Sequence, residues 1–529
     1  MAHTLPLPPI TKSVVRPAAW VEAAAAFSFA NLCYFRVWSE LLTYSRADAY
    51  LMKLPYSRAA YLAVMLNVLM VGAAGWALAS LVQSSRSRTV WVAARSVFFA
   101  LLLVPLNALR SVLANTYDYL RSPLFDLLGI RGVLLLAAVL AAAALTIVLR
   151  WPEQLLRAAR AVLLILSPLV LFTFAQAMWR AATYDASEFR DRATAPPLGQ
   201  KRAPRVLWVI LDEWDYRITF VNRPAGLPLP EMDRLRRESF SADNAAPPGP
   251  ETLISMPALL TGRAVSDAFK RGPSELLLVR PGEARPVTWR GRPNIFDSVR
   301  TAGFDTALVG WYHPYCRELA SSLTHCEWWK MSMQYNTMGR TLAELIPGET
   351  RSLFETSLLS AFGQSLSTSD HSRTYREMMV RALAVATDPA YGFTLLHLPV
   401  PHAPHAYSRR TGRFDLKNSP IRGYADSLAL ADRTIGDIRR ALEKAGLWDS
   451  TAVLFTSDHG YRSAKAFDGR SDPRIPFLLK LPGQAAGMEF APPFDTLLTG
   501  RLLLAILRRE VATPRDAVAW IGAHQAAQR

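Results

Sequence analysis

Long apolar stretches dominate the first third of the chain. Five windows there hold about 18 to 25 mostly apolar residues, the length that the hydrocarbon core of a bilayer requires of a helix. Stretches such as RGVLLLAAVLAAAALTIVL lack the polar stripe of a helix in a soluble bundle. The pattern therefore predicts five membrane spans, at Trp20–Leu42, Ala59–Leu81, Val90–Leu109, Gly132–Leu149 and Ala161–Trp179.

The basic residues between these spans predict their orientation. With a cytoplasmic N-terminus, the inner segments hold more Lys and Arg than the outer ones, and Asp48, Asp118 and Asp126 offset the outer charges. An odd number of spans then delivers everything after residue 180 to the outside. The leader MAHTLPLPPITKSVVRPAAW lacks a small-residue cleavage site, so the first span is expected to be a retained anchor.

A different pattern begins after residue 205. Short apolar runs alternate with helical periodicity, which predicts an α/β domain with a mostly parallel sheet. The long helix is expected at Tyr424–Ala445, before Gly446. The predicted buried parallel strands are VLWVIL (206–211), TALVGW (306–311), FTLLHL (393–398), AVLFTS (452–457) and PFLLKL (476–481). The chain thus divides into a transmembrane domain (1–180), a polar, Pro-containing linker (181–205) and an exported domain (206–529).

Charge and cysteine content narrow the environment. The net charge of +17 could indicate nucleic acid binding, but Lys and Arg are scattered and no nucleic-acid motif is present. Attraction to anionic phospholipid head groups suits a membrane protein better. Three cysteines are too few for a disulfide scaffold. Cys33 falls in the first span, whereas Cys316 and Cys326 belong to the exported part, where they either pair or remain two reduced thiols.

Metal-binding side chains follow three of the predicted strands. Asp212 and Glu213 come after the first strand, Asp458 and His459 after the fourth, and His402 with His405 after the third. In a parallel sheet, ligand groups collect at the carboxyl ends of the strands. Carboxylates and imidazoles bind divalent metals, so their convergence predicts a metal site.

Three stretches resemble the alkaline phosphatase and sulfatase superfamily. YADSLALADRTIGDIRRALEKAGLWDSTAVLFTSDHG (424–460) is similar to the sulfatase segment that runs through a long helix into a strand and ends in S-D-H-G. DPRIPFLLKLPG (472–483) resembles the strand that follows it, and VILDEW resembles the first metal-binding strand end. The resemblance covers about residues 204 to 485 and implies a metal-anchored nucleophile.

The stretch PETLISMPALLTGR (250–263) contains the candidate nucleophile. Counting back from LLTGR places Thr252 where sulfatases carry the cysteine of C-x-P-x-R, with Ile254 and Met256 replacing the proline and arginine. Threonine cannot be oxidised to formylglycine, which disfavours sulfate-ester hydrolysis. T-x-x-S-x-P instead resembles the phosphoethanolamine transferases of Gram-negative bacteria, whose nucleophile is a threonine. Those enzymes and the lipoteichoic acid synthases also carry five spans ahead of an exported domain, which implies a multi-pass protein of the bacterial inner membrane with a periplasmic catalytic domain.

The expected chemistry is a two-step displacement. Asp212, Asp458, His459 and Thr252 would bind one divalent cation, Zn²⁺ or Mn²⁺, with Ca²⁺ and Mg²⁺ as alternatives. Thr252 would attack a phospholipid donor, and an envelope lipid or glycan would accept the head group. His402 would contact phosphate oxygens or protonate the leaving oxygen. An isolated threonine here would otherwise be a plain N-cap.

Several further roles stay open. Glu213 is either another metal ligand or a brace for its loop. His405, Lys465, Arg474 and His313 are candidate substrate-binding residues, with solvation the alternative for Lys465 and packing for His313. His397 lies inside a strand and is expected to be a core residue. Residues 461–477 contain no histidine, unlike the transferases, which counts against a second zinc site.

Three functions are compatible with these patterns. The first is a transferase that moves phosphoethanolamine or phosphoglycerol from a lipid to an envelope acceptor. The second is a membrane-anchored hydrolase, a phosphodiesterase or sulfatase. The third is a non-catalytic membrane protein for binding or assembly. Five spans favour the first, because a tethered hydrolase needs only one.

Overall fold

The chain forms two units. The computed structural model describes residues 19–113, 132, 135–136, 138–199, 203–331, 341–355, 366–414 and 420–526. Unit 1 comprises Met1–Thr43, Tyr56–Tyr184 and Met338–Phe362, and unit 2 comprises Tyr44–Pro55, Asp185–Thr337 and Gly363–Arg529. A short segment of unit 2, residues 44–55, therefore lies between two segments of unit 1 in the sequence. Likewise residues 338–362 of unit 1 lie between two segments of unit 2.

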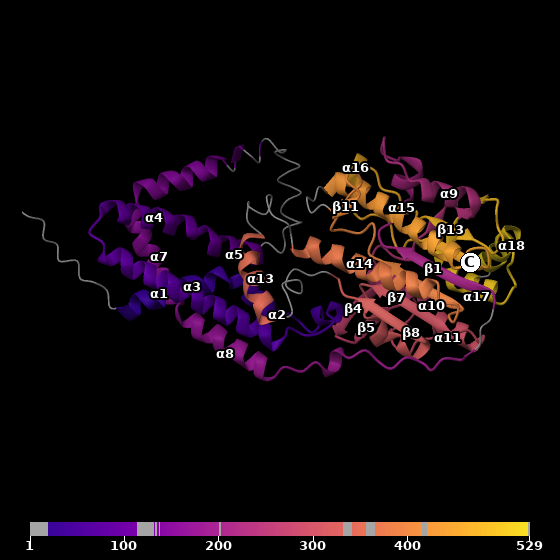
Figure 1. The fold of residues 1–529 in the computed structure, drawn as a ribbon, viewed down its shortest axis with the longest axis horizontal. Helices are drawn as coiled ribbons and strands as arrows, with labels where there is room; N and C mark the ends of the chain where they lie inside the picture. Colours follow the sequence, from indigo (N-terminus) through magenta and orange to yellow (C-terminus); the bar gives the residue numbers. More distant parts are fainter. Residues whose placement is uncertain are drawn as a thin grey trace, which may run out of the picture. The chain divides into compact units, whose positions relative to one another are not determined.

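Unit 1 is helical and largely apolar on its surface. Its helices lie side by side, with α1 against α3 and α7 (Figure 1). Large apolar side chains such as Leu171 and Ile165 are about three-quarters exposed, at 76% and 75%. Exposing such side chains to water is unfavourable, whereas contact with lipid is favourable. The described helices are α1 (Ala19–Cys33), α2 (Phe35–Thr43), α3 (Arg58–Ser84), α4 (Arg88–Leu101), α5 (Leu103–Leu113), an unlabelled helix Ala138–Arg150, α7 (Pro152–Leu166), α8 (Pro168–Ala182) and α13 (Leu342–Glu355).

Among the described residues of unit 1, three helices are long and apolar enough to cross a membrane. They are Arg58–Ser84, Arg88–Arg110 and Pro152–Ala182, which correspond to the second, third and fifth predicted spans. The first predicted span is divided at Tyr34 into α1 and α2. The fourth lies partly outside the described residues, and its described part is the helix Ala138–Arg150. Five spans are thus not confirmed.

Charged groups of unit 1 pair between helices. Arg95 of α4, which lies inside the third predicted span, donates to Glu153 of α7 at 3.1 Å. Arg160 of α7 lies 2.6 Å from Glu22 of α1. Pairing lowers the cost of placing a charge in an apolar surrounding.

A polar cluster holds α13 against α3 in unit 1. The side-chain amide of Asn67 donates to the Glu349 carboxylate at 2.8 Å, and Thr350 bonds to the hydroxyl of Tyr34 at 3.0 Å. Asn67 and Glu349 are 1% and 0% exposed. A helix from far along the sequence is thereby fixed to the apolar helices by matched donors and acceptors.

Unit 2 contains an eight-stranded sheet in the order β14-β2-β13-β12-β1-β9-β7-β8. All strands run parallel except β13, so the predicted mostly parallel α/β fold is confirmed. The strands are β1 (Arg205–Leu211), β2 (Phe240–Ala242), β7 (Thr306–Trp311), β8 (His325–Trp329), β9 (Phe393–Leu398), β12 (Thr451–Thr456), β13 (Phe477–Lys480) and β14 (Met488–Phe490).

The direction of β13 differs from the prediction. The run 476–481 was expected to be parallel, but β13 pairs antiparallel with both β12 and β2. The connection from β12 to β13 contains only the four-residue helix α16 (Lys465–Asp468). A parallel crossover normally needs a longer helix that packs on the sheet, and this connection does not provide one.

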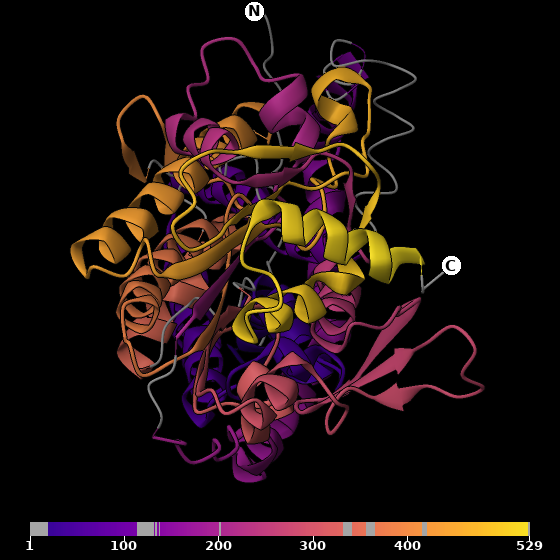
Figure 2. The same ribbon diagram turned by 90° about the vertical axis from the view of Figure 1, so that its right-hand side faces the viewer.

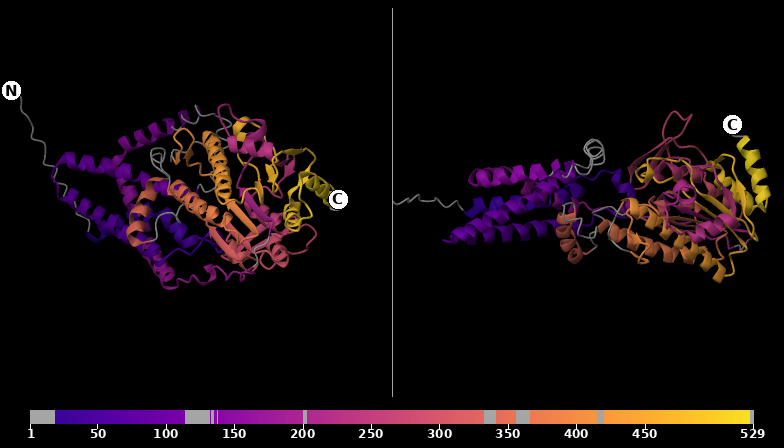
Figure 3. Two further views of the ribbon diagram at one scale, coloured as in Figure 1. Left: turned by 45° about the vertical axis from the view of Figure 1, so that its right-hand side comes forward. Right: turned by 90° about the horizontal axis from the view of Figure 1, so that it is seen from above.

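Helices cover both faces of this sheet. Val206, Trp208 and Ile210 of β1 belong to one core cluster, and Leu207 and Val209 to the other. Helices α14 and α15 lie side by side on the second face (Figures 1 and 3), and α17 and α18 belong to the first (Figure 2). Helix α15 confirms the predicted long helix. The helices are α9 (Pro230–Glu238), α10 (Thr252–Thr261), α11 (Ile295–Thr301), α12 (Tyr315–Glu318), α14 (Leu366–Ala386), α15 (Pro420–Lys444), α17 (Thr499–Leu507) and α18 (Pro514–Ala526).

Smaller elements complete unit 2. In the described part of the unit these are a three-stranded sheet, two two-stranded sheets and five short helical turns. They are β4 (Asp267–Gly272), β5 (Glu275–Val279) and β6 (Val287–Thr288); β3 (Ala245–Ala246) with β15 (Phe494–Asp495); β10 (Tyr407–Ser408) with β11 (Arg413–Phe414); and η1 (Asp48–Leu51), η3 (Ser187–Phe189), η4 (Arg217–Val221), η5 (Ala320–Ser322) and η8 (Thr496–Leu498).

The segment Tyr44–Pro55 is built into unit 2 by buried contacts. Tyr50 of η1 is 0% exposed and belongs to a core cluster of this unit. The buried guanidinium of Arg317 donates to the carbonyls of Met52 and Pro273. Lys53 donates to the carbonyl of Trp328 at 2.8 Å.

Cys316 and Cys326 form a disulfide bond between α12 and β8. Reducing the bond, or replacing both cysteines with serine, should lower the free energy of unfolding of unit 2 by about 2–3 kcal/mol, because a loop of this length loses little entropy on closure. Urea unfolding followed by tryptophan fluorescence measures this. The control is Cys33→Ser, since Cys33 is a free thiol in unit 1. Equal stability with and without reductant would contradict a stabilising role.

The buried Glu318 should make stability depend on pH. Its side chain is 0% exposed and lies 3.8 Å from Arg290, and burial raises its pKa to about 8. Because the folded pKa exceeds the unfolded value, the stabilisation is complete below about pH 4.3 and is lost as the pH rises towards 8. Wild type should therefore lose more stability than Glu318→Gln between pH 5 and 8. Parallel unfolding curves for the two proteins across this range would contradict the assignment.

Candidate active site

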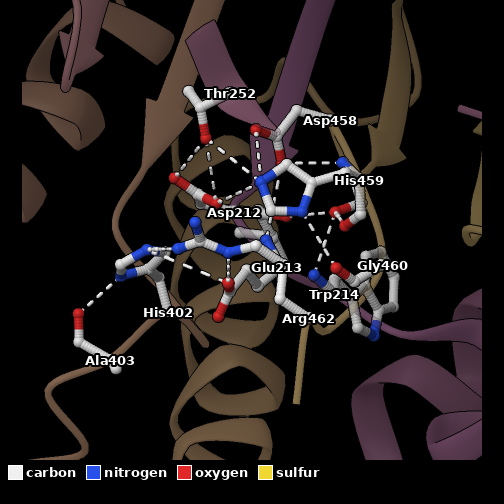
Figure 4. A network of polar contacts seen from close by, with 12 residues as sticks. Asp212, Glu213, Trp214, Thr252, His402, Ala403, Asp458, His459, Gly460 and Arg462 are labelled. Atoms are coloured by element: carbon white, nitrogen blue, oxygen red, sulfur yellow. Dashed lines mark hydrogen bonds and ion pairs between the residues drawn. The ribbon is translucent and has the colours of Figure 1, made fainter. Parts of the chain in front are cut away.

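The carboxyl ends of β12, β1, β9 and β7 lie next to one another in the sheet. Each strand is followed within a few residues by a histidine or a carboxylate residue. Figure 4 shows several of them converging on one point with Thr252 of α10. In strand order they are Asp458 and His459, Asp212 and Glu213, His402 and His405, and His313.

Asp212, Asp458 and His459 form a group that can hold a metal ion. Their ligand atoms all lie within 4.8 Å of one another, and the three residues are at most 2% exposed. The Nδ1 proton of His459 is donated to the Gly460 carbonyl at 2.9 Å. The lone pair on Nε2 therefore faces the aspartates, at 3.6 Å from Asp212 and 3.5 Å from Asp458. This is the tautomer that binds a metal through Nε2.

The group has more acceptors than donors. Two carboxylates and the Nε2 lone pair of His459 meet here, and Asp458 Oδ2 has no hydrogen-bond partner among the described residues. Burial raises the pKa of Asp212 well above its ordinary value, and repulsion from Asp458 and Glu213 adds to the shift. A bound cation would satisfy the lone pairs and relieve the repulsion. The donor set of two carboxylates and one imidazole fits a divalent metal.

Thr252 places its hydroxyl against this group. Glu251 is the N-cap of α10, so Thr252 is the first helical residue rather than the cap. Its Oγ1 lies 3.2 Å from Nε2 of His459 and 3.3 and 3.4 Å from the two carboxylate oxygens of Asp212. The hydroxyl can thus ligate the same cation as these residues, at a helix N-terminus that favours negative charge.

His313 holds the main chain of Thr252. A carbonyl only accepts hydrogen bonds, so Nε2 of His313 carries the proton that it shares with the Thr252 carbonyl at 3.0 Å. Nδ1 then accepts from the hydroxyl of Tyr50 at 3.0 Å. Burial lowers the pKa of His313 to about 3, which keeps the ring neutral. His313 is 0% exposed, and both of its ring nitrogens have protein partners.

Two residues at the site have a backbone conformation that side chains rarely adopt. Glu213 has φ 64° and Tyr312 has φ 75°, and neither is glycine. Glu213 follows the end of β1, and Tyr312 follows the end of β7. Such conformations persist only where the surrounding contacts enforce them, and they concentrate at functional sites.

The side chain of Glu213 turns away from the metal group and meets Arg462. Nε of Arg462 donates to Glu213 Oε1 at 2.6 Å, and Nη2 of Arg462 donates to Nε2 of His402 at 3.1 Å. His402 shares its Nδ1 proton with the Ala403 carbonyl. Glu213 and His402 are 3% and 6% exposed, whereas the side chain of Arg462 is 53% exposed.

The other residues predicted to bind substrate have partners other than Thr252 or face solvent. His405 bonds to Ser427 of α15 through Nδ1 at 3.0 Å. Arg474 forms a bidentate pair with Asp472 and lies over the ring of Tyr216. Lys465 is exposed. His397, expected in the core, is 0% exposed, bonds to Tyr315 at 2.8 Å and lies 3.7 Å from Asp212.

Sequence reasoning missed two residues of this site. Arg462 lies two positions after the glycine of S-D-H-G. A basic residue so close to a metal-binding motif could have been predicted to lie at the site. Tyr50 carries no such signal, because it lies among the predicted spans, 263 residues from its partner His313.

Residues 204–492 match the family model of the sulfatases. This match extends over more than half of the chain. The chain belongs to the sulfatase family. The expected resemblance to the alkaline phosphatase and sulfatase superfamily is therefore confirmed, and the chain is an enzyme of that superfamily. This removes the alternative of a non-catalytic binding protein. Members of the superfamily use a divalent metal, in agreement with the group Asp212, Asp458 and His459.

Individual relatives are similar over part of the chain. An endo-4-O-sulfatase of Bacteroides thetaiotaomicron is 37% identical over 89 residues, which is 16% of this chain and 16% of the relative. The solved structure of Ps i-CgsB is 19% identical and covers 60% of this chain and 74% of its own, with a TM-score of 0.41. The phosphonate monoester hydrolase of Agrobacterium radiobacter is 15% identical and covers 58% and 74%, with a TM-score of 0.38.

Proposed function

We propose that the chain is a metal-dependent membrane phosphotransferase. It would move a phospholipid head group, phosphoethanolamine or phosphoglycerol, through a covalent phosphothreonine to an envelope lipid or glycan. The observation that carries this proposal is the hydroxyl of Thr252, 3.2 Å from His459 Nε2 and 3.3 Å from Asp212. Threonine cannot provide the formylglycine of sulfate-ester hydrolysis, but its hydroxyl can attack phosphorus directly.

Each residue of the site has a role in the proposed reaction. Asp212, Asp458, His459 and Thr252 would hold the divalent cation, with Zn²⁺ or Mn²⁺ favoured. Such a cation lowers the pKa of a hydroxyl that it binds and offsets charge on the phosphate oxygens. His313 orients Thr252 through its carbonyl, at 3.0 Å. His402 donates through Nδ1 to the Ala403 carbonyl and accepts from Arg462 through Nε2, so a contact with a phosphate oxygen would have to replace one of these bonds.

The proposed reaction balances in two steps. In the first, the Thr252 oxygen forms a bond to phosphorus while the bond from phosphorus to the diacylglycerol oxygen breaks. The proton of the Thr252 hydroxyl leaves with the diacylglycerol. In the second, a hydroxyl of the acceptor attacks the phosphorus, and Thr252 recovers its proton. The acceptor then carries the head group and Thr252 is free again.

A membrane location supports a lipid donor. In the described part of the chain, three helices are long and apolar enough to span a bilayer. We propose that the two further predicted spans complete five, that the protein lies in a bacterial inner membrane and that unit 2 faces the periplasm. The disulfide of Cys316 and Cys326 favours an oxidising compartment of this kind.

The second candidate is a membrane-anchored hydrolase, a phosphodiesterase or a sulfatase. The family match and the similar segment of the endo-4-O-sulfatase favour it. In this case water would take the group from Thr252 in place of an envelope acceptor.

One experiment separates the two candidates. The detergent-purified protein is incubated with phosphatidylethanolamine or phosphatidylglycerol, each labelled in the head group, and its peptides are mapped by mass spectrometry. Transfer predicts a labelled phosphodiester on Thr252, and its passage to an added glycan or lipid acceptor. Release of the labelled head group to water, with or without an acceptor, supports the hydrolase. Absence of both label and release with every divalent metal would contradict the transferase and the phosphodiesterase, and release of sulfate from a sulfated glycan in the same assay would then support the sulfatase.

A further inference from the structure

The hydrogen bond between Tyr50 and His313 connects the candidate nucleophile to a distant part of the sequence. Tyr50 belongs to the segment Tyr44–Pro55, which lies between the first and second predicted spans and is part of unit 2. Its hydroxyl lies 3.0 Å from Nδ1 of His313, and Nε2 of His313 lies 3.0 Å from the Thr252 carbonyl. All three residues are at most 4% exposed. One imidazole ring therefore joins Tyr50 to the main chain of Thr252.

The two hydrogen bonds of His313 depend on each other. The Thr252 carbonyl can only accept, so the proton of the neutral ring lies on Nε2 and the lone pair lies on Nδ1. The hydroxyl of Tyr50 donates to that lone pair. Without this hydroxyl, a buried acceptor would lose its partner, which favours any rotation of the ring that finds another one. Tyr50 thus stabilises the orientation in which Nε2 faces Thr252.

Packing alone does not fix this orientation. The ring centroids of Trp289, Tyr312 and Tyr315 lie 5.0, 5.1 and 5.6 Å from that of His313. These rings limit where the imidazole lies. Carbon and nitrogen atoms of an imidazole have nearly the same size, however, so a flipped ring fits the same space. The hydroxyl of Tyr50 distinguishes the two orientations, because it bonds to a ring nitrogen and not to a ring carbon.

Helix α10 needs an outside contact at its first residue. Its N-cap, Glu251, forms no side-chain capping bond. Pro257 lies inside the helix and lacks the N–H that would bond to the carbonyl of Leu253. The first turn is therefore held by fewer bonds of its own than an ordinary helix start. The bond from His313 to the Thr252 carbonyl supplies support from outside the helix.

The segment Tyr44–Pro55 is itself fixed beside His313. Arg317, four residues after His313, is 0% exposed and donates to the carbonyls of Met52 and Lys53. Residues 313–317 therefore bind the segment at two points, through the side chain at each end. Tyr50 reaches His313 from a backbone that is held in place.

We propose that Tyr50 is a positioning residue for the nucleophile and acts through His313. This rests on the proposed function, in which the hydroxyl of Thr252 attacks phosphorus. Tyr50 is 0% exposed, so it does not meet the substrate. Its effect is to hold Thr252 in the geometry that attack requires, which contributes to kcat and not to substrate affinity. The segment between the first two predicted spans is then a functional part of the catalytic unit.

The alternative is that Tyr50 only fills the core of unit 2. Tyr50→Phe separates the two roles, because it keeps the ring and removes only the hydroxyl. Lys53→Met is the matched control. It removes another hydrogen bond of the same segment, the one from Lys53 to the Trp328 carbonyl at 2.8 Å, which does not involve His313. Both variants loosen the segment, but only Tyr50→Phe changes the partners of His313.

Turnover by the full-length protein in detergent measures the positioning role. The substrates are bis-p-nitrophenyl phosphate and p-nitrophenyl sulfate, which report attack by Thr252 whichever natural donor is correct. The kcat of Tyr50→Phe should fall about 10-fold, with KM within about 2-fold of wild type. The kcat of Lys53→Met should stay within about 2-fold of wild type. Adding Tyr50→Phe to His313→Ala should cause no further loss, because the two residues act in series.

A second measurement needs no turnover. Nitrogen NMR of protein labelled in its histidine rings shows whether each ring nitrogen is protonated and hydrogen-bonded, and His313→Gln assigns the signals of His313. In wild type, Nδ1 of His313 should give the signal of an unprotonated acceptor. This signal should shift in Tyr50→Phe and stay in place in Lys53→Met.

Three outcomes would overturn this inference. They are a kcat of Tyr50→Phe equal to that of wild type, equal losses of kcat in Tyr50→Phe and Lys53→Met, and an unchanged Nδ1 signal in Tyr50→Phe. Failure of the proposed function gives a different result. If phospholipid leaves no label on Thr252 while the soluble probes are turned over, lipid transfer is refuted and the positioning role of Tyr50 is still measured. Turnover that survives Thr252→Ala would refute both.

Discussion

Replacing Thr252 with alanine is expected to abolish turnover, with a loss in kcat of about 10³-fold or more. The side chain supplies the hydroxyl that lies 3.2 Å from His459 Nε2 and within 3.4 Å of both Asp212 oxygens. Ser255, one turn later, is 0% exposed, and its Oγ has no hydrogen-bond partner in the described structure, so it does not replace that contact. The measurement is head-group release and transfer from labelled phospholipid, with mass spectrometry of the peptide that contains residue 252.

Serine at this position is the matched control. Thr252→Ser keeps the hydroxyl and loses one methyl group, so it should retain a covalent adduct and a measurable part of the rate. Ser255→Ala should remain close to wild type. If Thr252→Ala kept a rate within 10-fold of wild type, covalent catalysis by Thr252 would be refuted.

Replacing Asp212, whose pKa is raised by burial and by repulsion from Asp458, with asparagine should have opposite effects with and without metal. The variant loses a charged ligand, so metal affinity should fall by about 100-fold or more and turnover should fall with it. In metal-free protein, the same change removes one of two buried like charges and should raise the stability of unit 2 by about 1–3 kcal/mol. Metal at 100 times its Kd should stabilise wild type by about 2.7 kcal/mol and the variant by much less.

Thermal unfolding of unit 2 with chelator and with saturating metal measures both effects. Asp426→Asn is the control, because Asp426 pairs with Arg409 at 3.0 Å, outside the metal group. It should leave the metal response unchanged. A metal-free Asp212→Asn protein less stable than metal-free wild type would show that the carboxylates do not repel each other as proposed.

The sequence predicted the fold of unit 2 because its signals are local. Five continuous apolar runs marked β1, β7, β9, β12 and β13, and the rule that ligands gather at the carboxyl ends of parallel strands brought Asp212 and Asp458 together. The direction of β13 was wrong, because an apolar run of this length reads the same in either orientation. The connection before it held the missing signal, since it contains only a four-residue helix.

Long-range partners explain what the sequence did not reveal. Tyr50 reaches His313 across 263 positions, and Asn67 reaches Glu349 across 282. No periodicity links such residues. The contact of Arg462 with both Glu213 and His402 likewise depends on the left-handed backbone of Glu213. The residues VILDEW do not predict this backbone conformation.

The interleaving of the two units limits how the polypeptide can be divided. A water-soluble fragment that begins after Tyr184 would lack residues 44–55. It would lose the hydrogen bond from Tyr50 to His313 Nδ1 and the Met52 carbonyl that accepts from Arg317. During synthesis, residues 44–55 are translated long before their partners, because Tyr50 and His313 are 263 positions apart. The support behind the nucleophile is therefore finished only after most of the protein has been translated.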